Sequence, residues 1–236
     1  EDRYQNALGL AHDLEECIAQ RARAGRIADF TLCTRDISER FNLPQKIFGR
    51  QREIAALLEA FGRVSEGSRE LVLVSGPPGI GKTMLIHEIH KPIVSRHGYF
   101  FSGKFDQLRR DVPYSSVIQA FQSLVRQILA EGSERVDRWR QRVVEAVDGD
   151  IGLITALIPE LEHLVGAHDD PPALAGEEAL IHFQAAFRRF TGVFARAEHP
   201  LAVFLDDMQW ADPGSLALVG ALASDPELSH LFFILS

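Results

Sequence analysis

The 236-residue sequence predicts an α/β fold of three layers, in which helices cover both faces of a mainly parallel sheet. Short apolar runs alternate with segments of helical periodicity, and this alternation is typical of parallel sheets. A glycine-rich turn separates one apolar run from the next helical segment, as expected where a strand leads into a helix. Apolar residues make up 46% of the chain and charged residues 25%, the composition of an ordinary globular domain.

The chain divides into a short N-terminal part and one large domain. Residues 4–24 have apolar positions at helical spacing, and a mixed segment with glycine and proline breakers follows. We therefore expect residues 1–45 to form a helix and a linker. Residues 46–236 should form the main domain, which begins with an amphipathic helix near 51–64.

The main domain should contain four strands. The first is the continuous apolar run 71–74, which is typical of a buried parallel strand. A helix should follow the glycine-rich turn, and Pro92 should kink or end it. The other strands are predicted at 99–101, 201–205 and 231–235.

A long helical insertion should precede the third strand, over about 113–197. Its last part carries phenylalanines at helical spacing, which we interpret as core packing: Phe183, Phe187, Phe190 and Phe194. After the third strand, Asp212 followed by Pro213 has the pattern of a helix N-cap.

The glycine-rich turn has the spacing of a phosphate-binding loop, G-x-x-x-x-G-K-[ST]. Its glycines allow backbone N–H groups to surround a phosphate, and the following helix points the positive end of its dipole at the same anion. A lysine then contacts the β and γ phosphates, and a threonine hydroxyl binds Mg²⁺. The predicted nucleotide-binding residues are Gly76, Pro77, Pro78, Gly79, Ile80, Gly81, Lys82, Thr83 and Met84.

The third strand ends in two carboxylates, Asp206 and Asp207. Mg²⁺ prefers oxygen ligands, so we expect Asp206 to hold the ion, through water, beside Thr83. Asp207 should orient or polarise the water that attacks the γ-phosphate, which makes Asp207 and Lys82 the candidate catalytic residues. Many enzymes with a phosphate-binding loop have glutamate at the position of Asp207, and the shorter aspartate side chain extends less far toward the γ-phosphate. The motifs together predict a P-loop NTPase.

Charge and composition disfavour several other functions. The formal net charge is −8, and an acidic surface repels nucleic acid and anionic membranes. No apolar run approaches the roughly 20 residues needed to span a bilayer. The two cysteines, Cys17 and Cys33, are too few for a disulfide framework, and reduced thiols in a cytoplasmic protein are the simpler interpretation. Because no Asn-Lys-x-Asp motif is present, ATP is favoured over GTP.

Four segments give the sequence a more specific resemblance. The first, IFGR at 47–50, resembles the hydrophobic-Gly-Arg signature of STAND and related AAA-like ATPases. The others resemble the ATPase module of bacterial multi-domain signalling kinases: HKPIV at 90–94, GYFFSGKFDQ at 98–107 and LDDMQWAD at 205–212.

The resemblance implies that Phe48, Gly49 and Arg50 contact the base and ribose. In that family a serine/threonine kinase domain precedes the ATPase, and GAF or PAS sensors and a histidine kinase follow it, so these domains are the expected partners. It also implies the strand order first–fourth–third–second. A further strand and a helical lid would lie beyond residue 236, so we expect an incomplete C-terminus, an exposed edge at 71–74 and self-association.

Three functions are compatible with these patterns. The leading one is a regulatory ATPase that acts as a nucleotide switch and binds MgATP or ADP. The second is a scaffold that binds ATP without hydrolysing it. A DNA-engaging AAA-like protein is the weakest of the three, because no basic face or DNA-binding module is visible.

Overall fold

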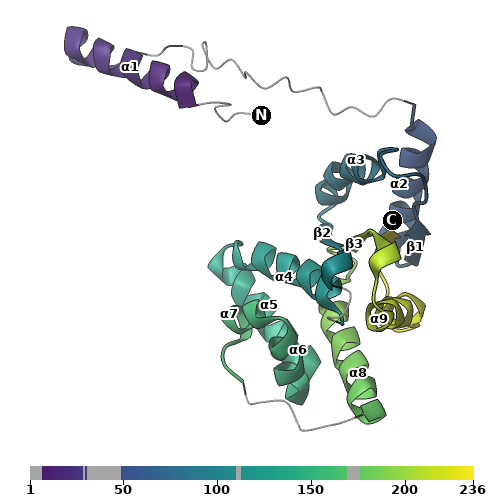
Figure 1. Cartoon of the computed structure of the whole chain (residues 1–236). Helices are drawn as coiled ribbons and strands as arrows, with labels where there is room; N and C mark the ends of the chain where they lie inside the picture. Colours follow the sequence, from purple (N-terminus) through teal and green to yellow (C-terminus); the bar gives the residue numbers. More distant parts are fainter. Residues whose placement is uncertain (1–6, 29, 31–48, 110–112, 169–175) are drawn as a thin grey trace. The chain divides into compact units, whose positions relative to one another are not determined.

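The computed structural model describes residues 7–28, 30, 49–109, 113–168 and 176–236. The chain divides into two compact units, residues 1–46 and residues 47–236. In the first unit the described part is mainly helix α1 (Ala7–Ala24). The second unit contains a four-stranded sheet with helices on both faces (Figure 1). The three-layer α/β fold expected from the sequence is confirmed.

The four strands of the sheet are β1 (Arg69–Leu73), β2 (Tyr99–Lys104), β3 (Leu201–Asp206) and β4 (Leu231–Leu235). Their order is β1-β4-β3-β2, and every neighbouring pair is parallel, as the sequence predicted. In this register Lys104 lies opposite Asp206. The carboxyl ends of all four strands therefore meet at one edge of the sheet, where polar side chains from distant segments come together.

One face of the sheet is covered by α2 (Gln51–Ser65) and α3 (Lys82–Ser95). Pro92 does not end α3, because the helix includes Pro92 and continues to Ser95; of the two expected effects, a kink stays a prediction. Ile93 is fully buried against the sheet, and the Ser95 hydroxyl donates to the Pro92 carbonyl at 2.8 Å. These contacts stabilise the last turn despite the hydrogen bond that proline cannot donate.

The other face is covered by the helical insertion and by the helix that follows β3 (Figure 1). The insertion comprises α4 (Ser115–Leu129), α5 (Ser133–Val147), α6 (Ile151–Leu157), α7 (Glu162–Val165) and α8 (Gly176–Phe194). Short 3₁₀ turns occupy Gln107–Arg109, Asp148–Asp150, Pro159–Leu161 and Met208–Trp210.

The predicted phenylalanine stripe of α8 lies in the core, and three of its four rings are fully buried. Helix α9 (Pro213–Ser224) begins as predicted. The Asp212 carboxylate accepts the Ser215 backbone N–H at 2.8 Å and the Ser215 hydroxyl at 2.6 Å, which caps the helix.

Strand β1 is only half-buried, which corrects the interpretation of 71–74 as a buried strand. Val72 and Val74 pack against the α2–α3 side of the sheet. Leu71 and Leu73 point to the other face and are 45% and 66% exposed. The apolar run therefore forms an edge strand that is covered on one face only. Within the described residues, β1 pairs only with β4.

Candidate nucleotide-binding site

The glycine-rich loop joins β1 to α3 and uses two glycines in the left-handed region. Gly79 has φ 79° and Gly81 has φ 96°, values that residues with a Cβ rarely adopt. Gly81 is the N-cap of α3, and no side chain caps this helix end. The N–H groups of the first turn, which include those of Thr83 and Met84, are therefore available to an anion at the positive end of the helix dipole.

The Lys82 side chain folds back over the loop. Its Nζ donates to the Gly76 carbonyl oxygen at 3.1 Å, so the charge is held beside the backbone donors. The loop also lines a cavity of about 330 Å³, together with Arg50 and Glu53 from the start of α2. This volume lies within the usual range for small-molecule sites.

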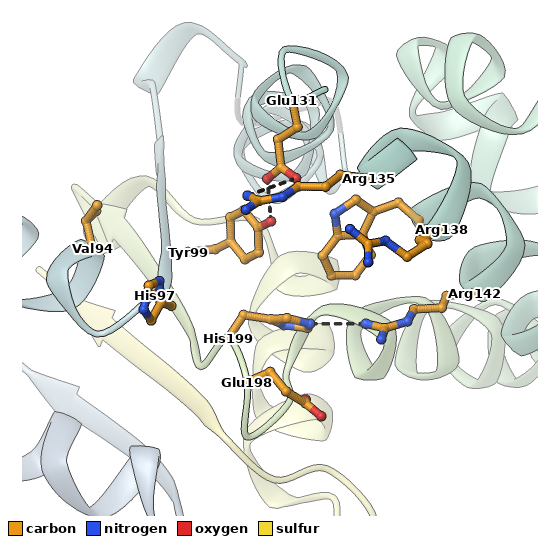
Figure 2. A pocket seen from close by; sticks show the side chains of 11 residues that line it. Val94, His97, Tyr99, Glu131, Arg135, Arg138, Arg142, Glu198 and His199 are labelled. Carbon is orange, nitrogen blue, oxygen red and sulfur yellow. Dashed lines mark hydrogen bonds and ion pairs between the residues drawn. The ribbon is translucent and has the colours of Figure 1, made fainter. Parts of the chain in front are cut away.

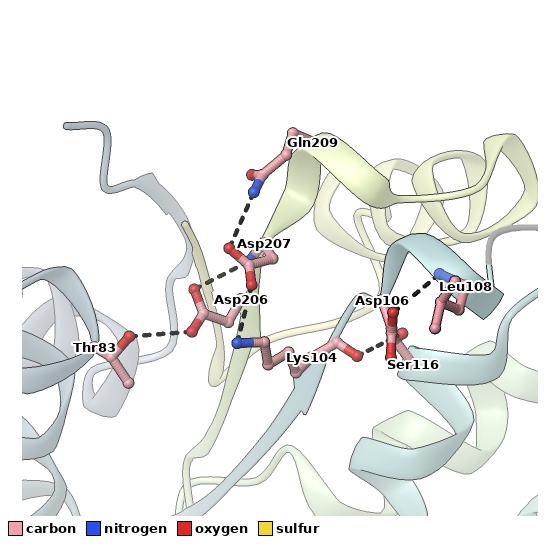
Figure 3. Close-up of polar contacts among 8 residues, drawn as sticks. All are labelled: Thr83, Lys104, Asp106, Leu108, Ser116, Asp206, Asp207 and Gln209. Carbon is pink, nitrogen blue, oxygen red and sulfur yellow. Dashed lines mark hydrogen bonds and ion pairs between the residues drawn. The ribbon is translucent and has the colours of Figure 1, made fainter. Parts of the chain in front are cut away.

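Thr83 and Asp206 meet directly, although 123 positions separate them in the sequence (Figure 3). The Thr83 hydroxyl donates to Asp206 Oδ2 at 3.1 Å, and Asp206 Oδ1 accepts the Asp207 N–H at 3.0 Å. Asp206 is 9% exposed. The contact brings together a hydroxyl and a carboxylate, the kind of oxygen groups that Mg²⁺ prefers as ligands, either directly or through bound water.

Asp207 is held by two neighbours. Lys104 Nζ lies 3.0 Å from Asp207 Oδ2, and Gln209 Nε2 donates to Asp207 Oδ1 at 3.0 Å (Figure 3). The hydrogen bond from Lys104 is the main reason that the pKa of the Asp207 carboxyl lies below its usual value. The residue also adopts φ 58° in the left-handed region, which residues other than glycine rarely adopt. The structure therefore places an ionised carboxylate beside Asp206, already engaged by a cation.

Sequence reasoning had not identified Lys104 and Gln209 as site residues. Both belong to segments quoted for the resemblance, but no role was assigned to them. The signal that could have found Lys104 is its place at the end of β2, because β2 pairs in parallel with the strand that carries Asp206 and Asp207.

The structure describes only the second half of the hydrophobic-Gly-Arg segment at 47–50. Phe48 lies outside the described residues, Gly49 has φ 78°, and Arg50 precedes α2. The Arg50 guanidinium forms an ion pair with Glu53 at 2.7 Å and lines the same cavity as the loop. Arg50 is therefore next to the candidate phosphate site, and its contact with a base or ribose stays a prediction.

A family model described as "AAA ATPase domain" matches residues 46–234. The chain belongs to this family. The AAA ATPase domain thus covers nearly all of the second compact unit, and the loop, Lys82 and the Thr83–Asp206 pair lie inside the matched range.

Three curated relatives of this AAA ATPase domain are histidine kinases. "Hybrid signal transduction histidine kinase G" of Dictyostelium discoideum is 34% identical over 94% of the chain. "Histidine protein kinase 1" of Candida albicans is 25% identical over 75%, and "Peroxide stress-activated histidine kinase mak3" of Schizosaccharomyces pombe is 25% identical over 70%. The chain spans 7–9% of the length of these relatives.

These relatives are eukaryotic, so the narrower expectation of a bacterial STAND protein receives no support from them and stays a prediction. Among the helices that the structure describes, none is long and apolar enough to cross a membrane.

Proposed function

We propose that this AAA ATPase domain binds MgATP and acts as a regulatory nucleotide switch within a larger signalling kinase. The observation that carries the proposal is the contact between Thr83, in the first turn after the loop, and Asp206, at the end of β3. It brings a magnesium-compatible oxygen pair next to an uncapped helix N-terminus with a lysine folded over it. The combination matches the charge distribution of a nucleoside triphosphate with its metal.

Each residue of the site then has a role. The backbone N–H groups from Gly79 to Met84 surround the β-phosphate, and Lys82 leaves the Gly76 carbonyl to contact the β and γ phosphates. Thr83 and Asp206 hold Mg²⁺, which neutralises charge on the phosphate oxygens when it is bound. Arg50 contacts the base side of the nucleotide from the rim of the cavity.

Hydrolysis depends on Asp207, whose carboxylate orients the attacking water. Its ion pair with Lys104 joins side chains that are 32% and 69% exposed, and such pairs contribute only about 0.2–1 kcal/mol. Breaking the ion pair with Lys104 therefore costs little free energy, and nucleotide binding can turn the Asp207 carboxylate toward the γ-phosphate. The ion pair with Lys104 therefore does not prevent Asp207 from orienting water once nucleotide is bound.

The place of the domain in a signalling protein is inferred from its relatives, whose names describe histidine kinases. We propose that the neighbouring kinase and sensor domains of the same polypeptide read the nucleotide state. A scaffold that binds ATP without hydrolysis is the alternative, and the engagement of Asp207 by Lys104 is the observation that favours it.

The substitution Asp207→Asn in the full-length protein separates the two functions. It keeps the shape of the side chain and removes its charge. For a switch, MgATP affinity should stay near the wild-type value and hydrolysis should fall about 100-fold, the scale of general-base loss. For a scaffold, wild type and variant should share the same background rate in a phosphate-release assay. Equal measurable turnover in both proteins would remove Asp207 from the mechanism.

A further inference from the structure

Figure 2 shows a second cavity, which shares no lining residue with the cavity at the phosphate loop. Its volume is about 480 Å³, within the usual range for small-molecule sites. Tyr99, the first residue of β2, and His199, which precedes β3, contribute to its wall. The cavity is thus built at the amino ends of these two strands, whereas Asp206 and Asp207 lie at the carboxyl end of β3.

Helix α5 presents three arginines to this cavity: Arg135, Arg138 and Arg142. Their spacing of three and four positions puts them on one helix face, one turn apart. Two lining carboxylates, Glu131 and Glu198, leave the arginines in excess. This concentration of positive charge is notable in a chain whose formal net charge is −8.

Arg142 is held in place by buried aromatic residues. His199 is 8% exposed, and its Nδ1 lies 2.7 Å from the Phe194 carbonyl oxygen, which can only accept. Nδ1 therefore carries the proton, and Nε2 accepts from the Arg142 guanidinium at 3.4 Å. The same guanidinium lies 5.4 Å from the centre of the Trp139 ring, a cation–π distance. Neither contact neutralises its charge, and its other N–H groups stay available.

Neither carboxylate of the cavity lies within ion-pair distance of Arg138 or Arg142. Glu131 accepts the Tyr99 hydroxyl at 2.6 Å and lies 3.9 Å from Arg135 (Figure 2). No hydrogen bond or ion pair joins Arg138 or Arg142 to a carboxylate in the part of the chain that the structure describes. The pKa of Glu198 is lowered mainly by its own backbone hydrogen bond and, to a smaller degree, by the charge of Arg142, which acts on it beyond ion-pair distance. The two guanidinium groups thus face the cavity without a directly bonded carboxylate.

We propose that this cavity is a second ligand site, which binds a small molecule through a phosphate group held by Arg138 and Arg142. Guanidinium groups bind phosphate oxygens through paired, charge-assisted hydrogen bonds, and two of them match the charge of a phosphate dianion. Trp139 and His199 fix one donor in advance, which lowers the entropy lost on binding. The proposal is independent of the nucleotide site, because the two sites share no residue.

Trp139 supplies a direct probe of this site. The chain has two tryptophans, and Trp210→Phe leaves Trp139 as its only indole. Adding Lys82→Ala prevents phosphate binding at the loop from contributing to the signal. In this double variant of the chain, the Trp139 indole N–H resonance is followed by ¹H–¹⁵N NMR at constant ionic strength. Inorganic phosphate, pyrophosphate and citrate are titrated separately to about 20 mM, which detects millimolar affinity.

We expect a saturable shift of the Trp139 resonance with phosphate and a tighter one with pyrophosphate. Arg138→Gln and Arg142→Gln should each weaken binding about tenfold or more, since each removes a charged donor. Arg140→Gln is the matched control, because Arg140 lies on the same helix but donates to the Leu164 carbonyl and to Asp137. The protein with Arg140→Gln should bind phosphate and pyrophosphate as tightly as the double variant without it.

Three results would overturn the proposal. The first is a shift that fails to saturate with either phosphate compound. The second is an equal effect of the glutamine substitutions at Arg138, Arg140 and Arg142, which would indicate general screening of the helix. The third is tighter binding of citrate than of pyrophosphate, which would assign the cavity to carboxylates.

Discussion

Substitution of Thr83 with valine should separate nucleotide binding from metal binding. Valine keeps the branched shape and removes the hydroxyl that donates to Asp206 Oδ2 at 3.1 Å. The loop, Lys82 and the start of α3 are otherwise unchanged. The substitution therefore tests one oxygen of the proposed magnesium site without altering the phosphate cradle.

The expected magnitudes follow from the burial of the two partners. A hydrogen bond to a charged group contributes about 1.5–3 kcal/mol, but Thr83 is exposed and water can replace its hydroxyl. We therefore expect the free energy of unfolding to fall by about 1 kcal/mol. Loss of a direct Mg²⁺ ligand should cost more, and 1.4–2.8 kcal/mol corresponds to a roughly 10- to 100-fold weaker affinity for MgATP.

Isothermal titration calorimetry with ATP, in excess Mg²⁺ and in EDTA, measures the affinity with and without the metal, and denaturant unfolding measures the change in stability. The valine variant should lose the Mg²⁺-dependent gain in affinity and retain the affinity measured in EDTA. Thr155→Val is the control, because that hydroxyl donates to Ile151 and Gly152 carbonyls within α6, away from the loop. The same Mg²⁺-dependent gain in wild type and Thr83→Val would refute the assignment of the metal to this oxygen pair.

Three further predictions concern the residues around the site and the edge of the sheet. Because Lys104 lowers the pKa of Asp207, their pair stabilises the fold above the unfolded pKa of the carboxyl, and this stability is lost as pH falls through the folded pKa. The stability advantage of wild type over Lys104→Met in denaturant unfolding should therefore shrink on acidification, and a constant difference would argue against the pair. Gly103→Ala places a Cβ against the Ser116 backbone oxygen and should lower the free energy of unfolding by about 1–3 kcal/mol, whereas unchanged unfolding would mean that β2 and α4 shift freely. Leu73→Lys, at the exposed face of β1, should reduce concentration-dependent association in sedimentation velocity, and a wild-type chain that stays monomeric at high concentration would contradict this.

The conformation of the glycine-rich loop and the contact between Thr83 and Asp206 could be predicted from the sequence because each depends on simple structural rules. A strand, a glycine-rich turn and a helix fix the loop, and parallel pairing brings the carboxyl ends of strands to one edge. Thr83 and Asp206 therefore meet although they are distant in the chain. The strand order came from the family resemblance, and the structure confirms it.

The engagement of Asp207 could not be predicted in the same way. It depends on the register of β2 against β3, which places Lys104 opposite Asp206, and on the left-handed backbone of Asp207. The exposure of Leu71 and Leu73 depends on which helices cover each face of β1. Pro92 continues α3 because tertiary burial of Ile93 outweighs a local preference. Such contacts arise only after the elements have packed.

The central claim is that the loop between β1 and α3 binds the phosphates of ATP, and Lys82→Ala tests it most directly. Lys91→Ala is the matched control, since Lys91 is an exposed lysine on the same helix. Isothermal titration calorimetry with MgATP should give measurable binding for wild type and Lys91→Ala and none for Lys82→Ala, with all three proteins equally folded by circular dichroism. Equal affinity in wild type and Lys82→Ala would contradict the account.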